Sequence, residues 1–190
     1  MRNLISFMHI SLDGFVAGPR GEMNWIQIND EIFAHVEQRI GKTDTALYGR
    51  ITYTMMENYW PTAADKPNAS RHDIAHSRWY KTAGKIVLST TLKTPESANT
   101  RVIAADLAAT IRAIKNEEGS EILVFGSPTA THSLLREGLI DGFWLFVNPI
   151  ILGQGIPLFT GSGESIKLKR ISTHAFDCGV TELNYLTENR

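Results

Sequence analysis

Apolar and polar residues change their spacing several times along the chain, and each change marks an expected element. An apolar run over residues 4–10 ends at the turn Leu12-Asp13-Gly14, which is typical of a strand and a tight turn. From residue 28, apolar residues recur every fourth position, which predicts an amphipathic helix: Ile28, Ile32, Val36 and Ile40. Either Asn29 or Asp30 would cap this helix.

Strand and helix patterns then alternate as far as residue 138. Strands are expected at residues 45–48, 85–88, 101–104 and 121–125, with helices between most of them. This alternation favours an α/β fold with a mostly parallel sheet flanked by helices in three layers. The tail differs, because residues 143–147, 166–174 and 180–186 have strand patterns without helices between them. They are expected to add antiparallel C-terminal strands, with a hairpin at Asp177-Cys178-Gly179.

Composition narrows the class of protein. The 190 residues suit a single domain, residues 1–190, and the net charge of -1 gives no basic face for nucleic acid. No segment is apolar enough to span a membrane or to serve as a signal peptide. The single cysteine, Cys178, forms no internal disulfide, so we expect a cytoplasmic protein.

Candidate chemistry lies where three expected strands end. The segments are Gly49-Arg50-Ile51-Thr52, Ser89-Thr90-Thr91 and Gly126-Ser127-Pro128-Thr129. Ligands of open α/β sheets bind outside the carboxyl ends of the strands, where helix N-termini attract phosphate. Glycine allows close approach of the backbone, and arginine grips phosphate through its planar guanidinium. Ordinary strand–helix turns use the same residues, but three such turns on one edge favour a dinucleotide.

An ordinary Rossmann site is not expected, because no G-x-G-x-x-G follows the first strand. The chain instead resembles the dihydrofolate reductase-like superfamily. Within it, the chain is most similar to the reductase domain of the bifunctional riboflavin-biosynthesis deaminase–reductase. The segments that carry the resemblance are Leu12 to Ala17, Tyr48 to Tyr53, Lys85 to Ser89, Val124 to Ser127, Leu134-Leu135, Gly138 to Asp141, and Asn148 to Gly155.

The resemblance implies an eight-stranded, mostly parallel sheet that binds NADPH across its carboxyl edge. Gly49, Arg50 and Thr52 would then hold phosphates, and Ser89 and Thr90 would lie near the 2′-phosphate. The pyrophosphate would lie on a cradle formed by Gly126, Ser127, Pro128 and Thr129, with Ala17 beside the nicotinamide. The family usually has a Gly-Gly pair at Gly126-Ser127, and here the serine would supply a hydroxyl cap.

The substrate side rests on fewer residues. Trp25 and Asp30 have the spacing of the tryptophan and the acidic residue of dihydrofolate reductases, in which the acid assists protonation of the pterin. Asp30 would be the catalytic residue, although acidic residues are also favoured at a helix start by the dipole. Asp13 would face the substrate, or else its side chain would cap the Asp13-Gly14 turn.

Other groups have simpler explanations. His72 and His76 lie four residues apart in an expected helix, and a solvated helix face explains them better than a metal site does. Gly153-Gln154-Gly155 and Gly161-Ser162-Gly163 mark a loop that would border the pocket or form flexible turns.

We therefore expect an NADPH-dependent reductase that transfers hydride to a small heterocyclic or related substrate, as in riboflavin biosynthesis. The zinc-binding deaminase half of the bifunctional enzyme is absent from this sequence. The alternatives are a dihydrofolate or pterin reductase, and a non-catalytic NADPH-binding module. No nucleic-acid or membrane partner is expected, and the apolar C-terminal strands would allow a homodimer.

Overall fold

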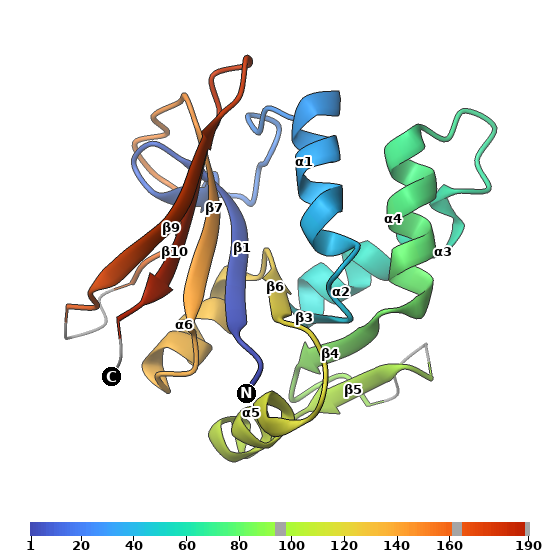
Figure 1. The fold of residues 1–190 in the computed structure, drawn as a ribbon, viewed down its shortest axis with the longest axis vertical. Helices are drawn as coiled ribbons and strands as arrows, with labels where there is room; N and C mark the ends of the chain where they lie inside the picture. Colours follow the sequence, from blue (N-terminus) through green and yellow to red (C-terminus); the bar gives the residue numbers. More distant parts are fainter. Residues whose placement is uncertain (94–97, 161–164, 189–190) are drawn as a thin grey trace. The chain divides into compact units, whose positions relative to one another are not determined.

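The computed structural model describes residues 1–93, 98–160 and 165–188. Gly161-Ser162-Gly163 lies outside the described residues. Six helices are present in this part of the chain: α1 (Asp30–Ile40), α2 (Arg50–Glu57), α3 (Trp60–Ala63), α4 (Arg71–Thr82), α5 (Leu107–Asn116) and α6 (Pro128–Arg136). The strands, labelled with the helices in Figure 1 where there is room, are β1 (Leu4–Ser11), β2 (Phe15–Ala17), β3 (Thr45–Gly49), β4 (Gly84–Leu88), β5 (Thr100–Ile103), β6 (Ile122–Phe125), β7 (Gly142–Asn148), β8 (Ile156–Pro157), β9 (Leu168–Ala175) and β10 (Thr181–Thr187).

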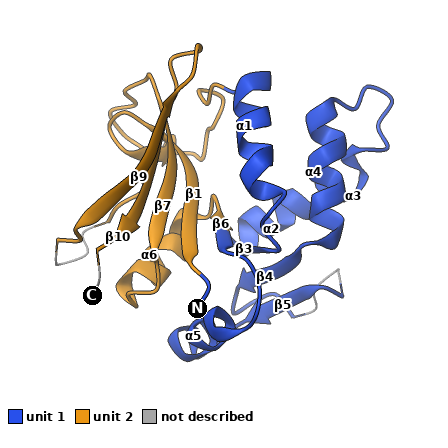
Figure 2. Ribbon diagram, in the orientation of Figure 1, with its two compact units in different colours: residues 1–2, 28–123 blue, residues 3–27, 124–190 orange. Residues whose placement is uncertain are grey.

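The fold is the mixed α/β fold expected from the alternating pattern. Eight strands form one mostly parallel sheet, in the order β5-β4-β3-β6-β1-β7-β10-β9, and a second sheet pairs β2 with β8. The chain divides into two compact units, coloured separately in Figure 2. Unit 1 comprises Met1–Arg2 and Ile28–Leu123, and unit 2 comprises Asn3–Gln27 and Val124–Arg190.

Unit 1 contains the parallel strands β3, β4 and β5. Gly49 at the end of β3 is paired with Leu88 at the end of β4, and Leu88 with Ile103. The carboxyl ends of these strands therefore lie at one edge. The middle of β3 is fully buried, which explains its continuous apolar run, Ala46-Leu47-Tyr48.

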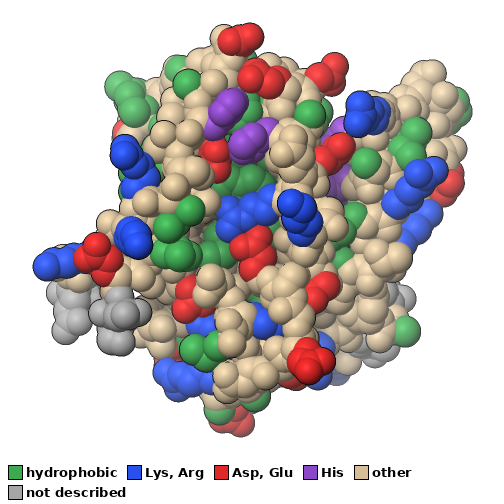
Figure 3. Space-filling view, viewed as in Figure 1, with side chains coloured by type: hydrophobic (Ala, Val, Ile, Leu, Met, Phe, Trp, Pro, Cys, Tyr) green, Lys and Arg blue, Asp and Glu red, His purple; other side chains and the backbone are tan. Residues whose placement is uncertain are grey.

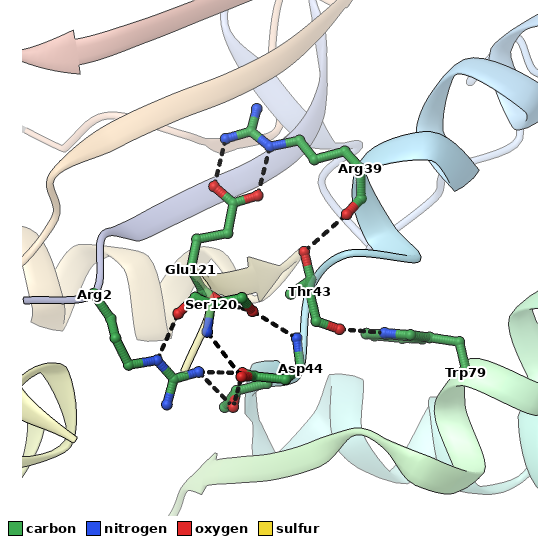
Figure 4. Close-up of polar contacts among 8 residues, drawn as sticks. Arg2, Arg39, Thr43, Asp44, Trp79, Ser120 and Glu121 are labelled. Carbon is green, nitrogen blue, oxygen red and sulfur yellow. Dashed lines mark hydrogen bonds and ion pairs between the residues drawn. The ribbon is translucent and has the colours of Figure 1, made fainter. Parts of the chain in front are cut away.

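Polar contacts in unit 1 hold the opposite, amino-terminal end of β3, as Figure 4 shows. The buried guanidinium of Arg2 contacts the Asp44 carboxylate, and its Nε donates to the carbonyl oxygen of Ser120 at 2.6 Å. Arg39 at the end of α1 forms a bidentate ion pair with Glu121, with N–O distances of 2.7 and 2.8 Å. These contacts fix the start of the strand whose far end carries Gly49.

Unit 2 contains β1, β7, β10 and β9. The prediction that residues 143–147 add an antiparallel strand was wrong, because β7 runs parallel to β1 from Ile5–Gly142 to Ser11–Asn148. The antiparallel part begins one strand later, where β10 pairs with both β7 and β9. The predicted hairpin is confirmed, since the N–H of Gly179 donates to Phe176 and the N–H of Phe176 donates to Val180.

His72 and His76 do not lie on a solvated helix face, and that prediction was wrong. The His72 ring stacks on Phe33 of α1 at 3.9 Å between centroids, and the His76 ring lies 4.0 Å from that of Trp60. His72 Nδ1 also lies 3.1 Å from the Glu37 carboxylate. The aromatic residues of α1 and α3 bury this side of α4, which periodicity within α4 alone does not reveal. Over the described residues, no group of histidine, cysteine and acidic side chains is arranged to hold a metal ion.

Both acidic and basic side chains lie on the face seen in Figure 3, with several acidic side chains together at its top. No helix in the described residues is both long enough and apolar enough to cross a bilayer.

Candidate nucleotide-binding loops

In unit 1, β3 leads directly into α2. Gly49 is the N-cap of α2 in extended conformation and provides no capping side chain, so the first-turn N–H groups of α2 receive no cap from it. Arg50 is the first helical residue and is exposed, and Thr52 is partly exposed in the same turn. Among the described residues, the Arg50 guanidinium has no ion-pair partner. A helix N-terminus with an available guanidinium suits an anion such as phosphate.

Ser89 lies at the same edge of unit 1, one residue beyond Leu88, the partner of Gly49. Its N–H donates to the carbonyl oxygen of Ile103, and its Oγ accepts the N–H groups of Thr91 and Leu92 at 3.1 and 2.9 Å. The hydroxyl oxygen thus shapes the turn, and Thr90 is exposed at its tip. The structure places Ser89 and Thr90 on the same strand edge as Gly49 and Arg50.

In unit 2, β6 ends at two successive left-handed residues, Gly126 with φ 53° and Ser127 with φ 58°. The Gly126 N–H donates to the carbonyl oxygen of Phe7 on β1 at 3.1 Å, and Pro128 begins α6 immediately afterwards. Thr129 is exposed in the first turn of α6. A left-handed conformation costs a non-glycine residue about 1–3 kcal/mol, and such strain concentrates at functional sites.

The predicted hydroxyl cap at Ser127 is absent. Ser127 occupies the N-cap position, but its side chain makes no capping hydrogen bond. Instead Oγ donates to the carbonyl oxygen of Phe125 at 3.0 Å. The positive φ turns the side chain back toward β6, so the first turn of α6 is not capped by this hydroxyl.

Ala17 is buried in β2 and pairs with Ile156 of β8. Gly155 approaches it so closely that a Cβ at position 155 would overlap the carbonyl oxygen of Ala17. Glycine at 155 is thus required for the backbone of the 153–155 loop to lie against the strand that carries Ala17.

Asp13 binds the same loop from the other side of the turn. Its carboxylate accepts hydrogen bonds from Ser11 Oγ at 2.7 Å and from the N–H groups of Leu152 and Gly153 at 3.1 and 2.8 Å. These hydrogen bonds, that from Ser11 above all, lower the pKa of Asp13. Asp13 therefore fixes the loop after β7 to the turn after β1, a contact that neither reading from sequence anticipated.

Trp25 and Asp30 lie in different units. In unit 2, the Trp25 indole N–H donates to the carbonyl oxygen of Glu22 at 3.0 Å, so the ring is held by its own turn. In unit 1, Asp30 is the exposed first residue of α1, and its neighbour Asn29 is the N-cap, with a side chain that accepts the Ile32 N–H. Asn29 therefore caps the helix, and the Asp30 carboxylate does not serve as the N-cap.

Sequence reasoning missed an aromatic face in unit 2 beside the Gly126-Ser127 turn. Phe7 stacks on Trp144 at 4.5 Å between centroids, and His9 stacks on Phe146 at 5.0 Å. The sequence carries a signal for this face, because Phe7 and His9, like Trp144 and Phe146, are two residues apart and so point to the same side of a strand. The parallel pairing of β1 with β7 places the four rings together.

The model of one protein family, the RibD C-terminal domain, matches residues 2–181. The chain belongs to this family. A relative of similar length, the uncharacterized protein YyaP of Bacillus subtilis (strain 168), is 28% identical over 187 residues, which cover 97% of this chain and 94% of YyaP.

Solved structures give the fold of this RibD C-terminal domain. A putative riboflavin biosynthesis protein from Shewanella sp. PV-4 has a TM-score of 0.72 at 21% identity, covering 98% of this chain and 99% of that one. The dihydrofolate reductase from Enterococcus faecalis complexed with NADP(H) has a TM-score of 0.64 at 14% identity, covering 98% and 97%. The predicted dihydrofolate reductase-like fold of the riboflavin-type reductase domain is confirmed.

Proposed function

We propose that this RibD-type domain is a cytoplasmic, NADPH-dependent oxidoreductase that transfers hydride to a C=N or C=O bond of a small, flat substrate. The observation that carries the proposal is the β6–α6 turn, in which Gly126 and Ser127 adopt successive left-handed conformations directly before Pro128. This turn brings backbone to the start of a nine-residue helix, whose first N–H groups attract a pyrophosphate.

NADPH is favoured over NADH by the residues of unit 1. The Arg50 guanidinium has no ion-pair partner in the described chain, and it stands at the start of α2 beside the Ser89-Thr90 turn. A planar guanidinium binds a phosphate through two parallel hydrogen bonds. The 2′-phosphate of NADPH would bind this positive charge, and NADH lacks that phosphate.

NADPH, when bound, supplies the hydride, and the protein orients the partners and excludes water. Gly49 and Thr52 of unit 1 and Thr129 of unit 2 would offer backbone and hydroxyl groups to phosphate, and Ala17 would lie beside the nicotinamide. Asp30 carries the proton to the substrate, and Trp25 and Asp13 border it. The substrate is a small molecule, with no nucleic-acid or membrane partner, and the C-terminal strands form a homodimer.

The test is a parallel titration of the purified protein with NADPH and NADH, followed by tryptophan fluorescence. Arg50→Ala is expected to weaken NADPH binding by about tenfold or more, as loss of a charged hydrogen-bonded pair does, and to change NADH binding little. Arg71→Ala is the matched control, because Arg71 is also an exposed first residue of a helix, in α4.

Equal losses in the two variants, or no binding of either nucleotide to the wild type, would refute the proposed cofactor site. Binding without oxidation of NADPH by a pterin, a flavin precursor or a quinone would instead identify a non-catalytic NADPH-binding module. Oxidation by dihydrofolate alone would favour the pterin reductase alternative.

A further inference from the structure

His9 stands on the face of β1 that is turned away from α6. Ser6 Oγ lies 3.5 Å from Thr131 Oγ1 of α6, so the even-numbered residues of β1 face that helix. Neighbouring residues of a strand point to opposite faces, so Phe7 and His9 lie on the other side of the sheet. The Gly126 N–H binds the carbonyl oxygen of Phe7, so β1 continues past the end of β6 and presents His9 beside the Gly126-Ser127 turn.

The buried amide of Asn148 defines the proton position on the His9 ring. Asn148 Oδ1 accepts the N–H of Gln27 at 2.8 Å, and a backbone N–H can only donate, so the other amide atom is nitrogen. That nitrogen, Nδ2, donates to the carbonyl oxygens of Phe146 and Ile10 and lies 3.5 Å from His9 Nδ1. The two hydrogens of Nδ2 serve these two carbonyl oxygens, and Nδ2 itself cannot accept a hydrogen bond. A proton on His9 Nδ1 would therefore face Nδ2 without an acceptor, so we assign the proton of the neutral ring to Nε2.

Burial lowers the pKa of His9 to about 4, so the ring is neutral at ordinary pH. The side chain is only partly exposed, and Nε2 has no hydrogen-bond partner among the described residues. His9 thus offers one N–H donor without a positive charge.

Aromatic rings surround the His9 side chain, and an acidic residue lies two strands away in the same sheet. Phe7 and Phe146 flank His9 at 6.3 and 5.0 Å between centroids. In the same row across the sheet, Phe146 is followed by Glu182, a buried acid that accepts the Trp144 indole N–H at 2.8 Å. A neutral donor, flat apolar walls and a nearby carboxylate suit an uncharged aromatic ring with a carbonyl, and disfavour an anionic substrate.

Building on the proposed reductase function, we propose that His9 Nε2–H is the hydrogen-bond donor to the carbonyl oxygen of an uncharged, planar aromatic substrate that packs against Phe7. In this role His9 would orient the carbonyl carbon to accept the hydride that NADPH supplies on its oxidation to NADP⁺. Nε2–H would hydrogen-bond the carbonyl oxygen as it gains negative charge, and this oxygen would then take up the proton assigned above to Asp30. The aromatic face, rather than a phosphate pocket, then selects the substrate.

The probe is 9,10-phenanthrenequinone, an uncharged planar dicarbonyl, titrated by calorimetry into protein saturated with NADP⁺ so that no turnover occurs. His9→Leu is expected to raise the Kd of the quinone about tenfold, because it removes one hydrogen bond at similar size. His9→Gln is expected to stay within about threefold, because the glutamine amide nitrogen can occupy the position of Nε2 and donate.

His174→Leu is the matched control, because His174 lies in the same row of the sheet on the exposed strand β9. NADP⁺ affinity is expected to be unchanged in all three variants. A second readout is nitrogen NMR of histidine-labelled wild type, in which the signal that His9→Leu removes should show the Nε2–H tautomer and shift with quinone.

Equal quinone binding by the wild type and His9→Leu would overturn the role of His9. Absence of quinone binding to protein that does bind NADP⁺ would overturn the substrate class while the cofactor proposal stands. Failure to bind NADP⁺, with quinone binding still dependent on His9, would refute the reductase function and leave the His9 site supported. An Nδ1–H tautomer would overturn the argument from Asn148.

Discussion

Ser127 Oγ donates to the carbonyl oxygen of Phe125, two residues earlier, while the backbone of Ser127 is left-handed with φ 58°. The hydroxyl therefore stabilises the end of β6 instead of the start of α6. This backbone conformation costs stability, and such strain is typically retained where the turn serves a function.

Replacement of Ser127 separates the hydroxyl from the backbone strain. Ser127→Ala and Ser127→Gly both lose the hydrogen bond, but only glycine adopts positive φ without steric cost. We expect the glycine variant to be more stable than the alanine variant by about 1 kcal/mol, the reverse of the order in a helix interior. Urea unfolding of both variants measures this, and a more stable alanine variant would show that Ser127 is not strained.

Gly155→Ala tests the close approach of the 153–155 loop to β2. The new Cβ would overlap the Ala17 carbonyl oxygen, so β8 must move away from β2. We expect a loss of about 1–3 kcal/mol, as for other overpacked sites, together with weaker NADPH binding. Gly84→Ala is the control, because its Cβ would meet the nearest atoms at an ordinary 3.6 Å. Equal melting temperatures for the two variants would contradict the prediction.

Arg2 and Arg20 each form an ion pair with a carboxylate, but the Arg2 guanidinium is buried whereas Arg20 is exposed. Its side chain is 7% exposed and binds both the Asp44 carboxylate and the Ser120 carbonyl oxygen, so Arg2→Ala leaves both groups without this donor. We expect a destabilisation of about 2–4 kcal/mol. Arg20→Ala removes a pair with Glu22, but Arg20 is 88% exposed, and little change in the free energy of unfolding is expected. Chemical unfolding of the two variants in parallel decides the comparison.

Two buried histidines predict loss of stability in mild acid. Burial lowers the pKa of His76 to about 3 and that of His9 to about 4, whereas in the unfolded chain each is near 6.5. Between these values the unfolded chain binds protons that the folded chain does not, so stability falls as pH decreases. Each histidine contributes about 1.4 kcal/mol per pH unit in this window.

The measurement is urea unfolding between pH 7 and pH 4.5. The pKa of Asp73 is lowered to about 2, mainly by its hydrogen bond with Ser70. The range is kept above the ordinary pKa of an aspartate, so that titration of Asp73 does not contribute to the pH dependence. His76→Gln is expected to remove about half of the pH dependence, and His174→Gln, on the exposed strand β9, is expected to remove little. An unchanged slope in His76→Gln would mean that His76 titrates normally in the folded protein.

The sequence by itself determined the local elements and the strand ends that carry the candidate loops. Four-residue periodicity located α1, and Gly-rich segments after apolar runs located the starts of α2 and α6. These features follow from interactions between near neighbours in the chain, namely backbone conformation, capping and one buried face, so they are visible in a short window.

Only the tertiary structure decided which strands pair and what faces each side chain. The parallel pairing of β1 with β7 brings Phe7 and His9 onto Trp144 and Phe146, more than 130 residues later. Asp13 binds the loop at Leu152 and Gly153, and His76 is buried by Trp60 of another helix. Such contacts depend on strand register and helix packing across distant segments, which no local pattern of polar and apolar residues encodes.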